Sequence, residues 1–239
     1  MTDWRFRPAR DHGLSNEERL RSHGRERGLG SLVLSTAWRT LVAAYLHGAH
    51  RLQVRGREHL PEPPFVMIAN HASHLDALTL AAALPWSTAR NTFALAAGDT
   101  FFSSTPAAAF AAYAVNALPV WRSRTTAADL AALRARLVED RAVFILFPEG
   151  TRSRTGVMAP FKPGIGALVA GTSTPVVPCW LEGTGAAWPA GQRLPRLGRL
   201  HLYIGPPLDF STATEDRAGG TVIAERCAEA VRALAPLHT

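Results

Sequence analysis

The 239-residue sequence has few cysteines, and the two it has exclude small folds held together by crosslinks. Cys179 and Cys227 are too few for a disulfide framework or for a zinc site built from thiolates alone. Isolated cysteines usually behave as small apolar side chains, so we expect both to be buried. Stability must then come from a hydrophobic core, for which a chain of this length is sufficient.

Long uncharged apolar runs are also missing. Residues 1–27 are charged almost throughout, so they do not have the pattern of a secretory signal. The longest apolar candidate, residues 28–49, is interrupted by Arg39 and His47, whereas a membrane-spanning helix needs about 18 or more uncharged apolar residues. The sequence therefore predicts a cytoplasmic address and no spanning helix.

Lysine is nearly absent, because Lys162 is the one lysine among 26 basic residues. With 19 acidic residues the formal net charge is +7, and the composition is 47% hydrophobic, which excludes a disordered chain. A basic nucleic-acid-binding module is one alternative. The sequence has no basic runs interleaved with aromatic residues and no recognisable binding motif, so we expect no nucleic acid among its partners.

Composition divides the chain into three segments. Residues 1–27 mix arginines with five acidic residues and predict a basic flexible arm, with one short helix where Ser15 and Glu18 have capping-box spacing. Apolar side chains recur at helical spacing over residues 28–50, which predicts an amphipathic helix. Residues 51–239 alternate apolar runs with helical patterns, and this alternation predicts a single α/β domain. We expect a central, mostly parallel mixed sheet flanked by helices and preceded by the N-terminal helical segment.

Four apolar runs have the length of buried strands, and a fifth alternates apolar and polar side chains, as expected of a strand nearer an edge. The first four cover residues 65–69, 92–96, 143–147 and 175–180, and the fifth covers residues 199–204. Helices are expected over residues 106–115, from Thr126 onward, and over residues 223–234.

His71 and Asp76 directly follow the predicted strand 65–69. In a regular helix they would lie about 140° apart around the axis and could not meet. Ser73 is a good N-cap, which puts Asp76 at the third helical position and leaves His71 in the preceding turn, within reach of the carboxylate. Such a pair fixes the imidazole tautomer and leaves the other ring nitrogen free to accept a proton. The alternative is a capping carboxylate beside an unrelated histidine at a strand end.

His74, in the same segment, opens a second alternative. His71, His74 and Asp76 could be ligands of a metal-dependent hydrolase. However, no later cluster of histidine, aspartate or glutamate follows a predicted strand to complete the coordination shell. We therefore expect no metal.

A second group of polar residues directly follows the predicted strand 143–147. It lies at the carboxyl ends of the strands, as His71 does, and this is the edge where open α/β sheets bind ligands. Gly150 lets the backbone approach a ligand, while Arg152 and the neighbouring hydroxyl of Thr151 are donors expected around a phosphate. The alternative is a solvated turn in which Glu149 makes a surface ion pair.

In this order and spacing the motifs resemble those of the glycerolipid acyltransferase family, the relatives of 1-acyl-sn-glycerol-3-phosphate acyltransferase. The family's His-x4-Asp motif is matched by His71 and Asp76, and its Phe-Pro-Glu-Gly-Thr-Arg-Ser motif is matched at every position by residues 147–153. Residues 119–122 match its Pro-Val-x-Arg motif, and Pro178 matches a strand proline. The resemblance covers residues 50–210.

The resemblance implies that His71 is a general base oriented by Asp76. The activated hydroxyl of a lysophospholipid, in the first place 1-acyl-sn-glycerol-3-phosphate, would attack an acyl thioester carried by coenzyme A or acyl carrier protein. No cofactor beyond this co-substrate is implied. The substrate-binding candidates are Arg122, Glu149, Gly150, Thr151, Arg152 and Lys162.

Departures from the family pattern open alternatives for the acceptor. Asp99 follows the second predicted strand where a basic residue is common, Asn116 stands where glycine is common, and Trp121 replaces a polar residue. We expect these positions to border the acceptor pocket, so another lyso-lipid or lipid hydroxyl is an alternative acceptor. A lipid acceptor also implies an anionic membrane surface as a partner, on the inner face of the cell membrane. The helix 28–50 is expected either to lie in that interface or to pack on the core.

Overall fold

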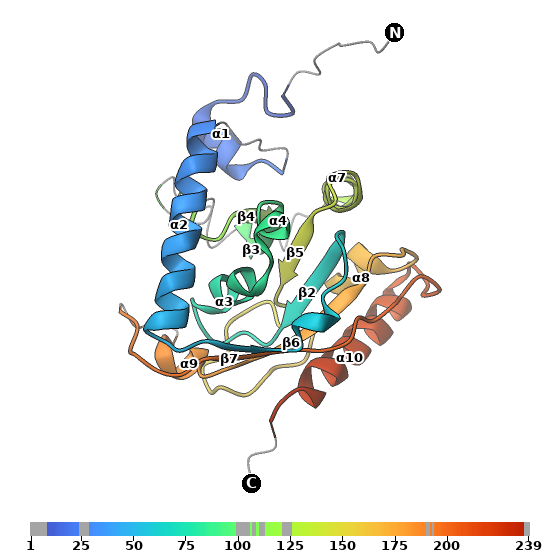
Figure 1. The fold of residues 1–239 in the computed structure, drawn as a ribbon. Helices are drawn as coiled ribbons and strands as arrows, with labels where there is room; N and C mark the ends of the chain where they lie inside the picture. Colours follow the sequence, from blue (N-terminus) through green and yellow to red (C-terminus); the bar gives the residue numbers. More distant parts are fainter. Residues whose placement is uncertain are drawn as a thin grey trace.

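A computed structural model of the chain describes residues 9–23, 29–98, 106, 109, 113–120, 126–189, 192 and 194–236. Its centre is a seven-stranded sheet in the order β1-β7-β6-β2-β5-β3-β4, with helices on both faces (Figure 1). The strands are β1 (Gln53–Arg55), β2 (Phe65–Ala69), β3 (Thr92–Ala97), β4 (Ala117–Val120), β5 (Val143–Leu146), β6 (Val176–Glu182) and β7 (His201–Ile204). All neighbours pair in parallel except β6 with β7, which confirms the predicted mostly parallel mixed sheet.

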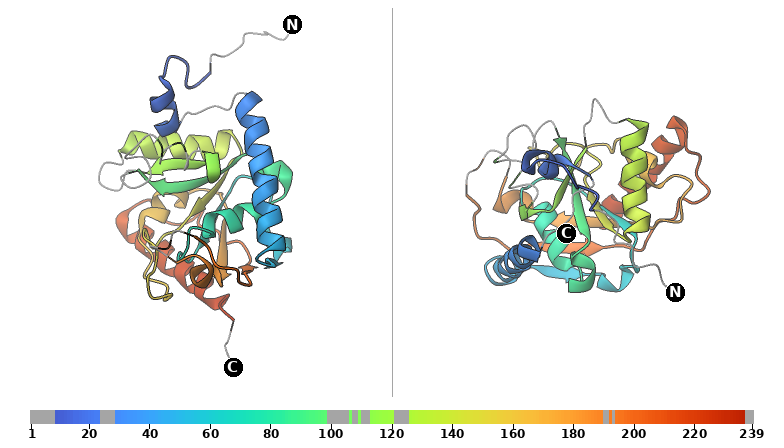
Figure 2. Two further views of the ribbon diagram at one scale, coloured as in Figure 1. Left: turned by 90° about the vertical axis from the view of Figure 1, so that its left-hand side faces the viewer. Right: turned by 90° about the horizontal axis from the view of Figure 1, so that it is seen from above.

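Helices cover the two faces of this sheet. They are α1 (Asn16–Arg21), α2 (Leu29–Gly48), α3 (Asp76–Ala83), α4 (Trp86–Ala89), α7 (Ala127–Glu139), α8 (Gly164–Val169), α9 (Thr184–Ala187) and α10 (Arg217–Ala233), with a 3-10 turn η1 (Arg57–His59). Seen from above, α2 lies on one side of the sheet and α7 and α10 lie on the other (Figure 2). The predicted helix 106–115 falls mostly outside the described residues.

Strand β2 separates two hydrophobic cores, because successive side chains of a strand point to opposite faces. Phe65, Met67 and Ala69 face the core beneath α2 and α3. Val66 and Ile68 face the core beneath α7, α8 and α10. Burial on both faces explains why this strand reads as a continuous apolar run in the sequence.

Both cysteines are buried in these cores, as expected from the sequence. Cys179 lies on β6 and Cys227 lies on α10. Burial raises the pKa of the Cys227 thiol to about 12, and it raises the pKa of Cys179 as well. Neither thiol is therefore ionised near neutral pH, which leaves them as packing groups.

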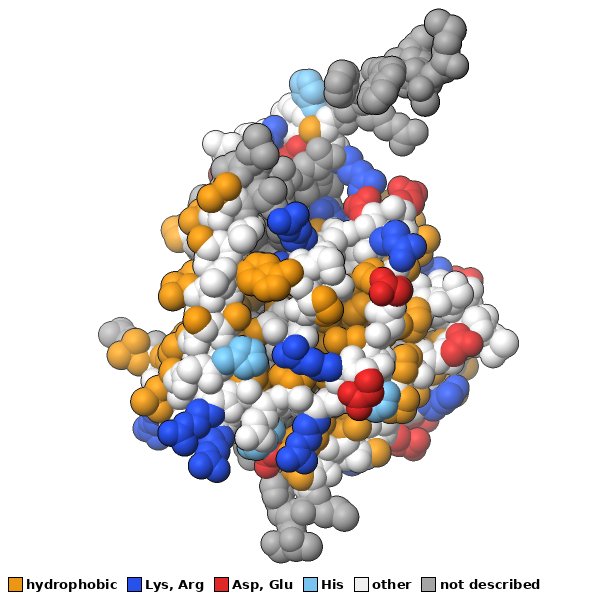
Figure 3. Space-filling model, viewed as in Figure 1, with side chains coloured by type: hydrophobic (Ala, Val, Ile, Leu, Met, Phe, Trp, Pro, Cys, Tyr) orange, Lys and Arg blue, Asp and Glu red, His pale blue; other side chains and the backbone are white. Residues whose placement is uncertain are grey.

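Helix α2 has two apolar faces. Val42 and Leu46 are buried against the domain, with Trp38 beside them. Elsewhere on the helix, Val33, Leu34 and Leu41 are each at least 60% exposed. Hydrophobic side chains accordingly follow the outward edge of α2 in Figure 3. Within the described residues, no helix has both the length and the apolar character needed to cross a bilayer.

The described part of the predicted arm contacts the domain. Ser15 and Glu18 form the predicted capping box at the start of α1. The Arg10 guanidinium donates two hydrogen bonds to the Asp140 carboxylate, at 2.8 and 2.9 Å. The imidazole Nε2 of His23 donates to the Pro119 carbonyl oxygen at 2.6 Å. These contacts link residues 9–23 to α7 and β4, while the boundaries at residues 27 and 50 stay predictions.

Two of the strands were not predicted. Strand β1 has only three residues, and β4 contains Pro119, a residue that argues against a strand in the sequence. Strand β1 takes the edge of the sheet, so β7, expected nearer an edge, lies second from it. Because β7 is antiparallel to β6 and β1 is parallel to β7, these two strands run opposite to the other five.

Candidate active site

The two predicted groups of polar residues meet at one edge of the sheet. Strands β2 and β5 pair in parallel, and their carboxyl ends at Ala69 and Leu146 lie side by side. The segments that follow, residues 70–76 and 147–153, therefore leave the sheet at the same edge. Asn70 ties this edge to β6 by two hydrogen bonds with the backbone of Leu181, at 2.8 and 2.9 Å.

His71 and Asp76 are in direct contact at this edge. The Nδ1 atom of His71 lies 2.8 Å from Oδ2 of Asp76, whose side chain is fully buried. The same oxygen accepts hydrogen bonds from the backbone amides of Ala72 at 2.7 Å and Ser73 at 2.8 Å. A carboxylate in this environment accepts, so Nδ1 carries the imidazole proton and Nε2 is left unprotonated. An imidazole of this tautomer can accept a proton at Nε2.

The local structure differs from the expected helix start. Helix α3 begins at Asp76, which is its first residue rather than its third, and Leu75 occupies the N-cap position. Ser73 is therefore not the N-cap: its hydroxyl donates to the Trp188 carbonyl at 2.8 Å and accepts from the Leu75 amide at 3.1 Å. The Ser73 amide does donate to Asp76, as in a capping box, but the Ser73 hydroxyl does not accept from the Asp76 amide, and the helix begins two residues later than predicted.

The segment after β5 holds His71 on three sides. The Phe147 ring is stacked on the imidazole, with ring centroids 4.0 Å apart and planes at 15°. The His71 amide donates to Oε1 of Glu149 at 2.7 Å. The His71 carbonyl accepts from the amide of Ser153, also at 2.7 Å. The backbone and the ring of His71 are thus fixed by residues more than 70 positions away in the sequence.

Glu149 uses both carboxylate oxygens within the chain. While Oε1 faces the His71 amide, Oε2 accepts from the Ala159 amide at 2.8 Å. The side chain is buried, and this burial raises its pKa, although both hydrogen bonds act in the opposite direction. The alternative of a solvated turn with a Glu149 surface ion pair does not match this geometry. The contacts favour a positioning role for Glu149, while its substrate-binding role stays a prediction.

Arg152 and His74 lie together beside this pair. The guanidinium Nη1 of Arg152 contacts Nε2 of His74. The His74 ring is tilted at 46° against the Trp188 ring, with centroids 5.0 Å apart. Burial lowers the pKa of His74, and Coulomb interactions with Arg152 and the His71 ring lower it further, whereas Asp76 acts in the opposite direction.

Gly150 and Lys162 are also brought together. Gly150 has a φ of +73°, and a Cβ atom at this position would lie 2.8 Å from Nζ of Lys162. The Lys162 amide donates to the Pro148 carbonyl at 2.9 Å, which anchors the lysine over the turn. The positive φ favours glycine at this position, whatever the space around it. Thr151 is exposed on the same turn, and Arg122 lies outside the described residues.

Asn116 does not border this edge. It precedes β4 and therefore lies at the amino end of the parallel strands, opposite to His71. Its side chain donates to the carbonyl oxygen of Thr92. With a φ of +50° it occupies a conformation that glycine adopts most easily and asparagine tolerates. Asn116 instead lines a cavity between α2, α3 and α4, and its backbone angle accounts for the residue type. Its place beside an acceptor pocket stays a prediction.

The metal alternative finds no support in the side-chain positions. Across the described ranges, which begin at residue 9 and end at residue 236, no group of three His, Cys, Asp or Glu side chains is placed to hold a metal ion. Although His74 is close in sequence to His71 and Asp76, its Nε2 contacts Arg152.

Three supporting residues were missed by reasoning from the sequence. Phe147 and Ser153 stand inside a recognised motif, so their presence was known but their contacts with His71 were not. Trp188 follows α9 more than 100 residues after His74, and no sequence pattern connects the two. The Trp188 indole Nε1–H donates to the Gln192 carbonyl at 2.9 Å, which fixes the ring that lies against His74.

The fold and the site together define an α/β domain with a His–Asp pair at the carboxyl edge of its sheet. Residues 51–182 match the family model described as Acyltransferase, and the chain belongs to this family. It is 33% identical to the 1-acyl-sn-glycerol-3-phosphate acyltransferase BAT2, chloroplastic, of Brassica napus, covering 69% of this chain and 47% of that protein. It is 29% identical to the 1-acyl-sn-glycerol-3-phosphate acyltransferase alpha of Homo sapiens, covering 72% and 59%. The chain thus spans about half to three fifths of the length of these curated relatives.

A solved structure shares the fold. The 1-acyl-sn-glycerophosphate (LPA) acyltransferase PlsC from Thermotoga maritima is 23% identical and superimposes with a TM-score of 0.62, covering 85% of this chain and 78% of that one. At this identity the likeness concerns the architecture. The predicted family resemblance and the predicted fold class are both confirmed.

Proposed function

We propose that the protein transfers a fatty acyl group from an acyl thioester to the hydroxyl of a lysophospholipid, in the first place 1-acyl-sn-glycerol-3-phosphate, which gives phosphatidate. The names of the curated relatives support this acceptor. The observation that carries the proposal is the 2.8 Å contact between His71 and the buried Asp76 carboxylate. It leaves one imidazole nitrogen unprotonated at the sheet edge where α/β folds bind their ligands.

In the proposed reaction, Nε2 of His71 takes the proton of the acceptor hydroxyl while the hydroxyl oxygen attacks the thioester carbonyl carbon. Asp76 stabilises the imidazolium that forms. Collapse of the tetrahedral intermediate breaks the carbon–sulfur bond, and the departing thiolate takes the proton back from His71. The ester and the free thiol are the products, so no covalent acyl-enzyme and no cofactor besides the thioester donor, coenzyme A or acyl carrier protein, are needed.

The phosphate of the acceptor is proposed to bind the cations of the turn after β5. Arg152 offers a planar guanidinium that matches two phosphate oxygens, and the ammonium of Lys162 lies over Gly150 on the same turn. Arg122, which follows β4, is the third cation proposed for this site. Thr151 would add a hydroxyl donor.

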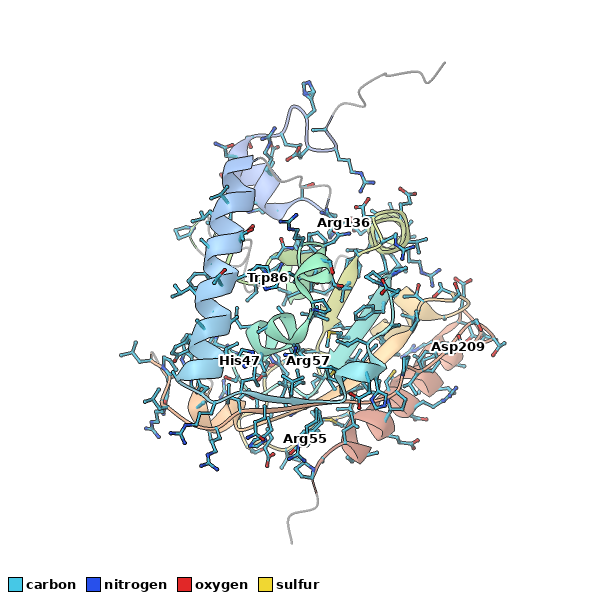
Figure 4. All side chains as sticks on the ribbon, viewed as in Figure 1. His47, Arg55, Arg57, Trp86, Arg136 and Asp209 are labelled. Carbon is cyan, nitrogen blue, oxygen red and sulfur yellow. The ribbon has the colours of Figure 1, made fainter. Side chains whose placement is uncertain are left out.

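An apolar cavity between α2, α3 and α4 is proposed to hold an acyl chain. Trp38 and Val42 of α2, Leu78 and Ala82 of α3, and Trp86 of α4 are among its lining residues. Figure 4 labels Trp86, on α4 next to α2. Helix α3 begins at the catalytic aspartate and extends about 12 Å along this cavity at 1.5 Å per residue. Replacing Ala82 by leucine should shift the preference toward shorter acyl chains.

We also propose that α2 lies in the interface of an anionic membrane, on the inner face of the cell membrane. Its outward face exposes Leu34 and Leu41, and the loop before β7 exposes Leu194 and Leu197 beside its end. His50 links the two, because its Nδ1 atom donates to the Gly198 carbonyl at 3.0 Å. In Figure 1 this loop lies next to the lower end of α2.

Vesicle flotation tests the membrane proposal with point substitutions. Deleting the helix would uncover the core that Leu46 fills, so the double variant Leu34→Glu and Leu41→Glu is preferable. It should lose most binding to anionic vesicles, whereas Val222→Glu on α10, an equally exposed apolar site on the other side of the sheet, should bind like the wild type. Equal binding by all three proteins would refute the interface helix.

An acceptor screen tests the proposed activity. Purified protein is incubated with radiolabelled acyl thioesters of coenzyme A and of acyl carrier protein, together with lyso-lipids that differ in their head group. The expected result is a new diacyl lipid with the monophosphate acceptor, and a weaker product when the phosphate is missing. If only a different lyso-lipid gives a product, the proposed acceptor is wrong, but the proposed acyl transfer stands. No product with any donor and acceptor would overturn the proposal.

A further inference from the structure

We propose that His74 is a positioning residue, which holds the Arg152 guanidinium in place for the phosphate of the acceptor through a hydrogen bond to its neutral imidazole. The inference rests on the proposed function and adds a residue to the acceptor site. It starts from the contact between Nη1 of Arg152 and Nε2 of His74.

The direction of this hydrogen bond is fixed by chemistry. A guanidinium has only donors, so Nε2 of His74 has to accept and the ring proton has to sit on Nδ1. Behind the imidazole the Trp188 ring lies 5.0 Å away. The Trp188 backbone is held by a hydrogen bond from the Ser73 hydroxyl to its carbonyl oxygen. The indole N–H donates to the Gln192 carbonyl, which fixes the ring. His74 is therefore supported from one side and faces the cation on the other.

The two histidines of the segment have separate partners. His71 binds Asp76, and the other two hydrogen bonds to that carboxylate oxygen come from the amides of Ala72 and Ser73. His74 contributes no hydrogen bond to Asp76 and contacts Arg152 instead. His71 is thus placed to accept a proton, whereas His74 is placed to hold the guanidinium of Arg152.

The charges around His74 keep its contact with Arg152 intact at neutral pH. Burial is the first cause that lowers the pKa of His74, followed by Coulomb interactions with Arg152 and with the His71 ring; Asp76 opposes them. The imidazole of His74 therefore stays neutral to a lower pH than a free histidine. Protonation would remove the acceptor and place two cations in contact, which releases Arg152.

The kinetic consequence separates His74 from the catalytic pair. If the imidazole holds Arg152, losing it weakens binding of the phosphate and raises the KM for the acceptor. The value of kcat at saturating acceptor depends on His71 and should change little. As the pH falls through the lowered pKa of His74, the acceptor KM should rise for the same reason.

Two substitutions test this prediction against each other. His74→Phe keeps a ring beside Trp188 but has no acceptor, whereas His74→Gln places an amide oxygen near the position of Nε2 and does not titrate. We expect His74→Phe to raise the acceptor KM about tenfold with kcat within about twofold of wild type, as for the loss of one hydrogen bond to a charged group. His74→Gln should restore the KM near neutral pH and flatten its rise in acid. The substrate phosphate also titrates, but its effect cancels when the acceptor KM values of the two enzymes are divided at each pH.

Nitrogen-15 NMR of the histidine side chains tests the contact without any assay of activity. The His74 signal is assigned by its loss in His74→Gln. We expect it to titrate below the usual histidine range in the wild type, and Arg152→Gln should raise its pKa by removing the facing cation. An unchanged pKa in Arg152→Gln, or a His74→Phe variant that lowers kcat as much as kcat/KM, would overturn the inference. Absence of acyl transfer in the wild type would instead refute the proposed function, and the NMR titration would still decide the contact.

Discussion

The two segments that meet at the carboxyl edge of the sheet have different tasks, although each follows a buried parallel strand. Residues 70–76 after β2 carry the imidazole and the carboxylate, joined within six residues. Residues 147–153 after β5 carry the groups that surround them: a stacked ring, a carboxylate and an amide on His71, and the Arg152 cation. The comparison teaches that the proposed reaction belongs to the first segment, while its geometry and charge belong to the second. Substitutions in the two segments should accordingly affect different kinetic constants.

The largest effect is expected for His71→Ala in the first segment. Without the imidazole, no other described side chain in contact with Asp76 can take the hydroxyl proton, so kcat should fall by about 10³-fold or more. The melting temperature should stay close to the wild-type value, because the side chain is at the surface of the site and 20% exposed. Acyl transfer is measured by thiol release in the presence of acceptor. Activity within tenfold of wild type would place the base elsewhere.

Asp76→Asn should have the second largest effect. The amide oxygen can take the place of Oδ2 and accept the same three hydrogen bonds, but the group is neutral and no longer stabilises the imidazolium that forms on His71. We expect kcat to fall about 10²-fold with little change in the KM for either substrate. If Asp76→Asn changes only the stability, Asp76 has a structural role at the start of α3 and none in the reaction.

Glu149→Gln tests whether the second segment acts through His71. The amide nitrogen of glutamine would face a backbone N–H, so one of the contacts to His71 and Ala159 is lost. A small displacement of the base should lower kcat about 10- to 100-fold and leave the acceptor KM unchanged. The opposite split, with an altered KM and a normal kcat, would restore Glu149 to the substrate-binding residues.

Arg152→Ala is the matching substitution for charge in the same segment. Loss of the guanidinium should raise the acceptor KM about tenfold, while kcat at saturation stays near the wild-type value. An acceptor without a phosphate should be used equally well by both proteins, which serves as the control. An unaffected KM would show that Arg152 does not bind the phosphate. The second segment would then act only by positioning His71.

The smallest effect concerns stability and pH. Because the pKa of His74 is lowered in the folded protein, the unfolded chain binds its proton more tightly, and the free energy of unfolding should rise with pH up to about 6.5. The melting temperature of the wild type should therefore gain about 2 °C or less relative to His74→Gln between about pH 5 and pH 7. Parallel curves for the two proteins would show that His74 is not shifted.

Features that depend on neighbouring residues in the chain could be predicted from the sequence. Strand β2 is apolar at every position because it is covered on both faces, and the short separation of His71 from Asp76 allows a turn to join them. The position of Asp76 in α3 was not predicted correctly, because the Ser73 hydroxyl contacts Trp188, far away in the sequence, and does not cap the helix.

Long-range contacts could not be predicted from one sequence. Arg152 follows His74 by 78 residues, and their contact depends on the parallel pairing of β2 with β5. Strand β1 pairs with β7, almost 150 residues later, and is too short to be recognised alone. Likewise, only the folded chain brings Lys162 over the turn at Gly150.

The most direct test of the central claim compares thiol release with two acceptors in the wild-type protein and in His71→Ala. One acceptor is 1-acyl-sn-glycerol-3-phosphate, and the other is its analogue without the free hydroxyl. The account predicts one thiol released per phosphatidate formed by the wild type, no release with the deoxy analogue beyond the background, and neither product with His71→Ala. Thiol release that does not need the acceptor hydroxyl, or that persists without the imidazole, would contradict it.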